Sequence, residues 1–156
     1  MPGDALPHES MDTTHFSVAD KFGNVTSNTY TLNSGFGSGI VVDGTGVLMN
    51  NEMDDFVSAP GIPNQFGLIG GEANKIEPFK RPLSSMTPTI VFHENKPIIA
   101  TGSPGGSRII TAVRQFRLNT LDFRMEISDA TDAHRIHQQW RPDVLRLEKG
   151  FEDGHA

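Results

Sequence analysis

The feature that most constrains the fold is a change of hydrophobic period near residue 108. Before it, two short strands at Thr89–Phe92 and Pro97–Thr101 flank the polar turn HENK. After it, in SRIITAVRQFRLNTLDF, apolar residues recur at helical spacing, mostly on one face: Ile109, Ile110, Val113, Phe116, Leu118 and Leu121. A hairpin that runs directly into an amphipathic helix, with no alternating βαβ pattern, predicts the α+β class, an antiparallel sheet covered by helices.

The rest of the chain supports the same class. The segment HFSVADKFGNVTSNTYTLN predicts a hairpin of His15–Val18 and Val25–Leu32 around a Gly-Asn turn. Residues 57–82 are rich in Pro and Gly and predict a long ordered loop. Further short strands are expected at Ile40–Val42, Val47–Met49 and Val144–Leu147, a short helix at Ser128–Ala133, an irregular segment before Val144, and a partly buried Trp140.

Composition excludes several kinds of function. The formal net charge of the 156 residues is −6, which argues against a nucleic-acid partner because phosphate binding needs a basic face. The chain has no cysteine, so disulfides, thiol nucleophiles and thiolate metal sites are excluded. The six histidines form no metal-ligand pair of the HExxH type, no apolar run is long enough to span a membrane, and no cofactor is implied.

Thr13 opens the first predicted strand with a second threonine and a histidine. A threonine hydroxyl inside a chain is a poor nucleophile, but it becomes reactive as the first residue, because its own α-amine then accepts the proton. That state requires cleavage of the Asp12–Thr13 bond. From spacing alone, β-branched residues at a strand start are the simpler interpretation of this threonine pair.

The segment TGSPGGSR places Gly105 and Gly106 directly before the amphipathic helix. Backbone N–H groups at such a turn are able to hold a developing oxyanion, since glycine lets the chain approach a ligand closely. No Lys-Ser or Lys-Thr follows, so the segment does not fit a phosphate loop. A tight strand-to-helix turn with no catalytic role explains the same residues.

Three further groups of polar residues are candidates for catalysis or ligand binding. Carboxylates cluster in NNEMDDF, where the spacing of a calcium loop is missing, so acid–base work, an ammonium ligand or simple solvation remain open. Two hydroxyls lie between prolines in PLSSMTP, which suits a small anion or a turn. The candidates are Glu52, Asp54 and Asp55 in the first group, Ser84 and Ser85 in the second, and Thr31 and Asn33 at the end of the first hairpin.

Taken in order, the segments TTHFSV, TYTLN, GSGI, NNEMDDF, GGEAN, RPLSSMTPTI and TGSPGGSRIIT resemble the small subunit of the γ-glutamyltranspeptidase family. The resemblance runs from Thr13 to about Phe151. It implies an N-terminal nucleophile (Ntn) hydrolase with a four-layer αββα sandwich. It also implies a precursor that cuts itself before the threonine of TTH, and transfer of γ-glutamyl groups from glutathione and related amides to amino acids, peptides or water.

The resemblance also assigns roles by position. Thr13 is then the nucleophile, Thr31 its hydrogen-bonding partner, and the N–H groups of Gly105 and Gly106 form the oxyanion hole. The remaining positions are expected to bind the glutamyl group: Asn33, Glu52 and Asp55 its α-amino end, and Ser84 and Ser85 its α-carboxylate.

The resemblance divides the chain into two parts. Residues 1–12 correspond to the end of the large subunit, and residues 13–156 to a small subunit truncated at its C-terminus. The large subunit, which in the family supplies an arginine to the substrate carboxylate, is therefore an expected partner, and the isolated segment is expected to be inactive and poorly folded. Members of the family are periplasmic or secreted, although residues 1–12 contain no hydrophobic stretch of the signal-peptide type.

Two alternatives remain at this stage. A glutaryl cephalosporin acylase would keep the fold and mechanism, but its substrate has no ammonium to pair with Asp55. A non-catalytic homologue or fragment would keep the scaffold and leave the Asp12–Thr13 bond intact.

Overall fold

The computed structural model describes residues 13–151, which form four antiparallel hairpins, two α-helices and four shorter helical segments. The strands are β1 (Thr14–Ala19), β2 (Val25–Tyr30), β3 (Val41–Val42), β4 (Val47–Leu48), β5 (Thr89–His93), β6 (Lys96–Thr101), β7 (Ile136–His137) and β8 (Arg146–Leu147). The helical segments are η1 (Glu52–Asp55), η2 (Glu72–Asn74), η3 (Gly106–Arg108), α1 (Ile109–Arg117), the π-helical η4 (Leu118–Asp122) and α2 (Ile127–Asp132).

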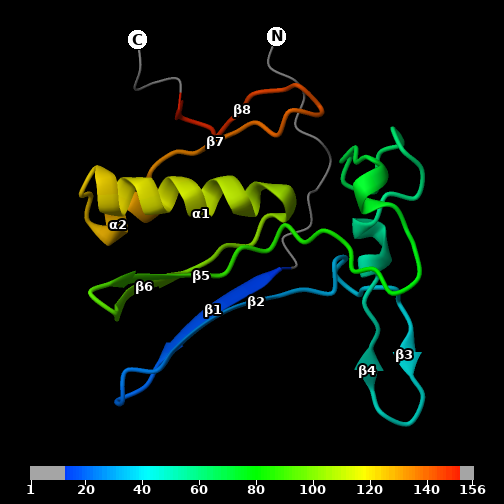
Figure 1. Ribbon diagram of the computed structural model, residues 1–156, viewed down its shortest axis with the longest axis horizontal. Helices are drawn as coiled ribbons and strands as arrows, with labels where there is room; N and C mark the ends of the chain where they lie inside the picture. Colours follow the sequence, from blue (N-terminus) through cyan, green and yellow to red (C-terminus); the bar gives the residue numbers. More distant parts are fainter. Residues whose placement is uncertain (1–12, 152–156) are drawn as a thin grey trace.

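The hairpins are arranged in layers (Figure 1). The β1–β2 and β5–β6 hairpins lie side by side, and the Ser27 hydroxyl of β2 donates to the Thr101 carbonyl of β6 at 2.9 Å. Helix α1 lies over β5–β6, and the β7–β8 hairpin lies on the opposite side of α1. Strands covered by a helix confirm the α+β class.

The predicted hairpins are confirmed, with small differences at their ends. Strand β2 stops at Tyr30 and not at Leu32, and β3 begins at Val41. In the β5–β6 hairpin, His93 pairs with Lys96, so the turn consists of Glu94 and Asn95, whose φ angles of 49° and 62° suit a tight turn.

The amphipathic helix is also confirmed, but its buried face is narrower than the sequence predicted. Ile109 and Val113 are buried, whereas Ile110 is 47% exposed because it lies on the outer face. The helix starts directly after η3 and its last turn widens into η4, so the apolar repeat does not form one regular helix.

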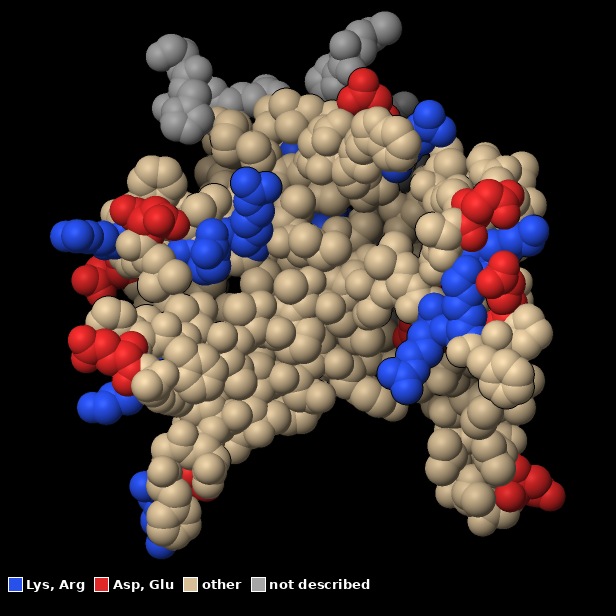
Figure 2. Space-filling view, viewed as in Figure 1, with Lys and Arg blue, Asp and Glu red and all other residues tan. Residues whose placement is uncertain are grey.

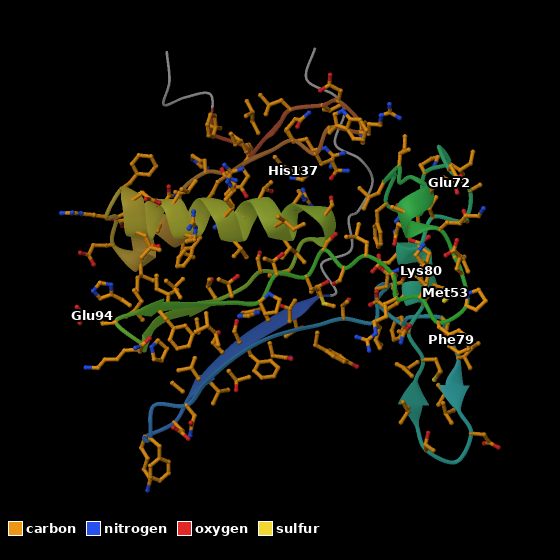
Figure 3. All side chains as sticks on the ribbon, in the orientation of Figure 1. Met53, Glu72, Phe79, Lys80, Glu94 and His137 are labelled. Carbon is orange, nitrogen blue, oxygen red and sulfur yellow. The ribbon has the colours of Figure 1, made fainter. Side chains whose placement is uncertain are left out.

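Two expectations for the C-terminal part were wrong. The segment expected to be irregular contains β7, which α1 holds through the buried His137 (Figure 3). The His137 ring bonds to the Thr111 hydroxyl and to the Gln139 amide oxygen, both at 2.9 Å. Trp140 is 69% exposed, and the Arg141 guanidinium stacks on its ring at 4.5 Å.

Residues 57–82 form a long loop, as expected, with η2 inside it. Two isolated bridges fold the loop on itself, Pro63 with Ile69 and Val57 with Lys75. The loop is therefore ordered by its own backbone pairing and does not need a regular sheet.

The buried hydrophobic set of residues 13–151 is small, comprising Phe56, Val57, Ile109, Val113 and Ala130. Many large apolar side chains are exposed on the β1–β2 and β5–β6 hairpins, here called the central hairpins, including Phe16, Val18, Tyr30 and Phe92. Figure 2 shows charged side chains mainly near the margins of the view, around a broad central area without them. Exposed large apolar side chains in such number are typical of a surface that binds another protein segment. Within residues 13–151, no helix combines the length and the apolar character that crossing a bilayer requires.

Candidate active site

One pocket brings together eight of the nine residues to which the resemblance assigns roles. Its lining includes Thr13, Thr31, Asn33, Glu52, Asp55, Ser84, Ser85 and Gly106. Gly105, the ninth, lines the neighbouring cavity on the other side of the same loop. These residues come from five separate stretches of the chain, so the fold has assembled them.

The β1–β2 hairpin positions Thr13 and Thr31. Its register pairs Thr14 with Tyr30, so Thr13 and Thr31 lie at the same end of the two strands. The Thr31 hydroxyl accepts a 3.0 Å hydrogen bond from the Asn33 N–H, which leaves the hydroxyl proton free to donate. Asp12, on the other side of the bond expected to be cut, lies outside the described residues.

Asn33 is held in place immediately after this hairpin. It is buried, its φ angle of 76° turns the chain out of the strand direction, and its side-chain amide donates to the Asn51 carbonyl at 3.2 Å. This bond ties the end of β2 to the start of η1, and it places Asn33 beside the two carboxylates that line the pocket.

Helix η1 presents Glu52 and Asp55 on one face, because residues three apart are eclipsed in a 3-10 helix. Burial, together with a hydrogen bond to Asp55 and its negative charge, raises the pKa of Glu52 to about 7. Burial and the charge of Asp54 also raise the pKa of Asp55, although its hydrogen bond to Glu52 acts in the opposite direction. Burial and mutual repulsion make it unfavourable for both carboxyls to be ionised at once. A bound cation would stabilise their charged forms.

The 57–82 loop holds η1 in place through hydrogen bonds to the backbone of η1. The Asn74 side chain donates to the Asp55 carbonyl at 2.6 Å, and the Asn64 side chain donates to the Asp54 carbonyl at 3.3 Å. Phe56 and Val57, which follow η1, are buried. Sequence reasoning gave this loop no role, yet it fixes the carboxylates.

Ser84 and Ser85 approach the pocket from the segment before β5. The Ser84 hydroxyl accepts from the Met86 N–H at 3.2 Å, and the Ser85 carbonyl accepts from the Thr87 hydroxyl at 3.0 Å. These local bonds fix the segment, and both serines line the pocket, which suits a carboxylate ligand.

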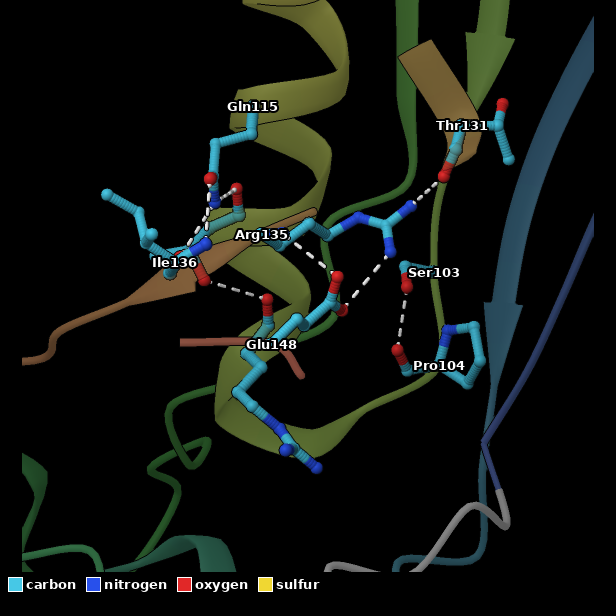
Figure 4. Close-up of polar contacts among 9 residues, drawn as sticks. Ser103, Pro104, Gln115, Thr131, Arg135, Ile136 and Glu148 are labelled. Carbon is cyan, nitrogen blue, oxygen red and sulfur yellow. Dashed lines mark hydrogen bonds and ion pairs between the residues drawn. The ribbon is translucent and has the colours of Figure 1, made fainter. Parts of the chain in front are cut away.

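Residues 102–107, here called the glycine loop, separate this pocket from a second cavity of about 330 Å³. The second cavity lies between Ser103–Gly105, helix α1 and the β7–β8 hairpin. Polar contacts fasten that hairpin (Figure 4): Arg135 pairs with Glu148 at 3.3 Å and also donates to the Thr131 carbonyl, and Gln115 of α1 donates to the Ile136 carbonyl at 2.7 Å. These contacts hold the β7–β8 hairpin against α1, so the hairpin forms the far wall of the second cavity.

His15 of β1 lies against the segment that leads from Gly102 to Gly105 and Gly106. His15 bonds to the Thr29 hydroxyl at 2.9 Å and to the Ser17 hydroxyl at 3.1 Å, and burial lowers the pKa of its ring. The ring lies so close to Gly102 that a Cβ added there would overlap it. Thr13 lies two residues before His15, and the glycine loop begins at Gly102. The contact between His15 and Gly102 therefore keeps Thr13 near this loop.

We expect Gly102→Ala to destabilise the protein by about 1–3 kcal/mol, because the new methyl group overlaps the His15 ring and a packed site cannot yield freely. Thermal or chemical unfolding of the full-length protein measures this loss. The double variant His15→Ala/Gly102→Ala should lose less than the sum of the two single variants, since removal of the ring makes room for the methyl group. Additive losses would contradict the proposed contact.

The pocket also contains residues that sequence reasoning did not select: Phe66, Leu68, Met86, Ser107 and Ile109. Phe66 and Leu68 come from the long loop, which carries no local signal of a site. Ser107 directly follows the two glycines, so its position in TGSPGGSR was a usable signal. Among residues 13–151, no group of three or more His, Asp or Glu side chains is arranged to hold a metal ion.

Comparison with known proteins decides the family. The family model described as gamma-glutamyltranspeptidase matches residues 4–156, almost the entire chain. The chain belongs to the γ-glutamyltranspeptidase family. The resemblance found in the sequence motifs is therefore confirmed.

Individual relatives agree with this assignment. The chain is 57% identical over 150 residues to the glutathione hydrolase proenzyme of Escherichia coli, covering 96% of this chain but only 26% of that protein. A crystal structure of a γ-glutamyltranspeptidase mutant from Helicobacter pylori is 59% identical, with a TM-score of 0.82 over 87% of this chain and 73% of that chain. An acivicin-inhibited γ-glutamyltranspeptidase is 58% identical, with a TM-score of 0.81 over 86% of this chain and 71% of that chain. The Ntn-hydrolase fold expected from the resemblance is thus confirmed, and the chain spans about a quarter of the Escherichia coli relative.

Proposed function

We propose that the protein containing this chain is a γ-glutamyl acyltransferase and hydrolase that cleaves glutathione and other γ-glutamyl amides through an ester on Thr13. The single observation that carries the proposal is the pocket that two threonines, two carboxylates, two serines and a glycine line together. In this proposal the relatives' name, glutathione hydrolase proenzyme, applies to this chain as well.

The first step is self-cleavage. The Thr13 hydroxyl attacks the Asp12 carbonyl, the peptide nitrogen leaves as the free α-amine of Thr13, and the acyl group moves to oxygen. Water then hydrolyses this ester and releases the Asp12 carboxylate. In the matured chain the α-amine accepts the hydroxyl proton, so the same oxygen becomes a nucleophile for substrates.

In turnover, the Thr13 oxygen attacks the γ-carbonyl of the substrate, and the developing oxyanion is held by N–H groups of the glycine loop. The amine of the substrate leaves with the proton, and a γ-glutamyl ester remains on Thr13. An acceptor amine or water then attacks the ester carbonyl, and the Thr13 hydroxyl is restored.

Recognition follows from the charges of the glutamyl group. Its α-ammonium fits the acidic side of the pocket at Asn33, Glu52 and Asp55, and its α-carboxylate fits the hydroxyls of Ser84 and Ser85. Each charge-assisted contact contributes roughly 1.5–3 kcal/mol, so loss of one should weaken binding about tenfold or more. These contacts hold the γ-amide against Thr13.

The proposal extends to subunits and location. Residues 1–12 would be the end of a large subunit, and residues 13–156 part of the small subunit. The large subunit would cover the exposed apolar side chains of the central hairpins and supply the arginine for the substrate carboxylate. By analogy with the family, the protein would be exported to the periplasm or secreted.

Intact mass and turnover test the proposal on the full-length precursor. We expect a new chain that begins at Thr13, and hydrolysis of γ-glutamyl-p-nitroanilide by the matured protein. An uncut precursor without turnover would support a non-catalytic homologue. Preference for a glutaryl amide over the γ-glutamyl amide would support an acylase, because such a substrate lacks the ammonium that Glu52 and Asp55 would bind.

The raised pKa of Glu52 predicts a pH dependence of substrate binding. Protonated Glu52 attracts an ammonium group weakly, so KM for the γ-glutamyl donor should fall about tenfold as pH rises through about 7. Steady-state kinetics between acidic and mildly alkaline pH measure this. Glu52→Gln, which cannot ionise, should remove most of the change; an unaltered pH profile in that variant would assign the titration to another group.

A further inference from the structure

One buried hydroxyl in the pocket has no assigned role. Within residues 13–151, the buried side-chain atoms without a hydrogen-bond partner are Asp54 Oδ2 and Ser107 Oγ. Ser107 lines the same pocket as Thr13 and Gly106, whereas Asp54 lines a different one. A buried hydroxyl without a partner destabilises a folded protein, so its presence calls for an explanation.

The position of Ser107 is fixed on both sides. It directly follows Gly106 within η3, whose turn is closed by a 3.1 Å bond from the Arg108 N–H to the Gly105 carbonyl. Two residues later, Ile109 is almost fully buried at 1% exposure and begins α1. The serine therefore cannot move far without shifting the glycine loop or unpacking the helix.

The neighbours of Ser107 indicate which part of a substrate it meets. The charged ends of the glutamyl group are assigned to residues of η1, the end of β2 and the 84–85 segment. Ser107 belongs to none of these, and it directly follows Gly105 and Gly106, which are assigned to the reacting carbonyl. A hydroxyl donates one hydrogen bond, and a carbonyl oxygen that becomes negatively charged is a strong acceptor.

We propose that the Ser107 hydroxyl is a further donor to the oxyanion at the γ-carbonyl, beside the N–H groups of the glycine loop. This inference rests on the proposed function. No proton is transferred from Ser107. Its hydrogen bond strengthens as negative charge develops on the carbonyl oxygen and weakens again when the ester forms. The Ser107 hydroxyl, which is buried without a hydrogen-bond partner, would gain one when the carbonyl oxygen of a bound substrate lies beside it.

The test compares Ser107→Ala with wild type in the full-length precursor, using matured protein whose mass shows Thr13 as the first residue. With γ-glutamyl-p-nitroanilide, kcat of Ser107→Ala should fall about 10- to 100-fold while KM changes by less than roughly threefold, since the contact forms mainly in the transition state. The melting temperature should stay unchanged or rise, because the substitution removes a buried hydroxyl that has no partner.

Ser103→Ala is the matched control. It removes the same group from the same loop, but the Ser103 hydroxyl donates to the Pro104 carbonyl at 2.7 Å and lines the second cavity. Its kcat should remain near the wild-type value.

Two results would overturn the inference alone: an unchanged kcat in Ser107→Ala, or a reduced kcat together with a clearly lowered melting temperature, which would indicate a structural bond. Absence of turnover in the wild type would overturn the proposed function and the inference with it.

Discussion

Replacing Thr13 by Ala in the full-length precursor is expected to abolish both self-cleavage and turnover. The same oxygen atom performs both reactions in the proposed mechanism, so no other group in the pocket replaces it. Loss of a catalytic nucleophile typically lowers kcat by roughly 10⁴-fold or more. Intact mass measures the cleavage, and release of p-nitroaniline from γ-glutamyl-p-nitroanilide measures the turnover.

Two variants make this result specific. Thr14→Ala alters the neighbouring threonine, which is the exposed first residue of β1 and lies outside the pocket, and it should retain both activities. Thr13→Ser keeps the hydroxyl and should retain part of each. Cleavage of the Asp12–Thr13 bond in Thr13→Ala would show that the nucleophile of processing is another residue.

Gly105→Ala is expected to have the second largest effect, a fall in kcat of about 100-fold or more. Gly105 has φ 129° and ψ 25°, a conformation that side-chain-bearing residues rarely adopt. A Cβ would have room, since its nearest neighbour is the Arg108 Cβ at 4.0 Å, so the cost lies in the backbone. Relief of about 1–3 kcal/mol of strain would rotate the loop and misalign its N–H groups from the oxyanion.

Gly71→Ala is the control for Gly105→Ala. Gly71 has a φ of −114°, and a Cβ added there would meet no atom within 4 Å. Kinetics and thermal unfolding of both variants separate a local effect on catalysis from a general effect of the added methyl group. Equal kcat values for the two variants would contradict the role proposed for the Gly105 backbone.

Local sequence predicted the hairpins and the helix well because their signals lie within a few residues. The turn at Glu94 and Asn95 joins two predicted strands, and α1 begins after η3, the short helical turn that contains Gly106. Burial was less predictable: Trp140 is exposed and Ile110 faces outward, since the exposure of a side chain depends on which distant elements cover it.

The sequence by itself determined which chemical groups are available: a threonine at a strand start, a glycine pair before a helix, a pair of serines and a cluster of carboxylates. The motif order also determined the family. Tertiary structure alone decided that these groups line one pocket, because five segments far apart in the chain converge there. It also decided the raised pKa of Glu52 and the unpaired state of the Ser107 hydroxyl. Both depend on burial, which is the largest cause of the Glu52 shift, and burial depends on which distant elements pack around a side chain.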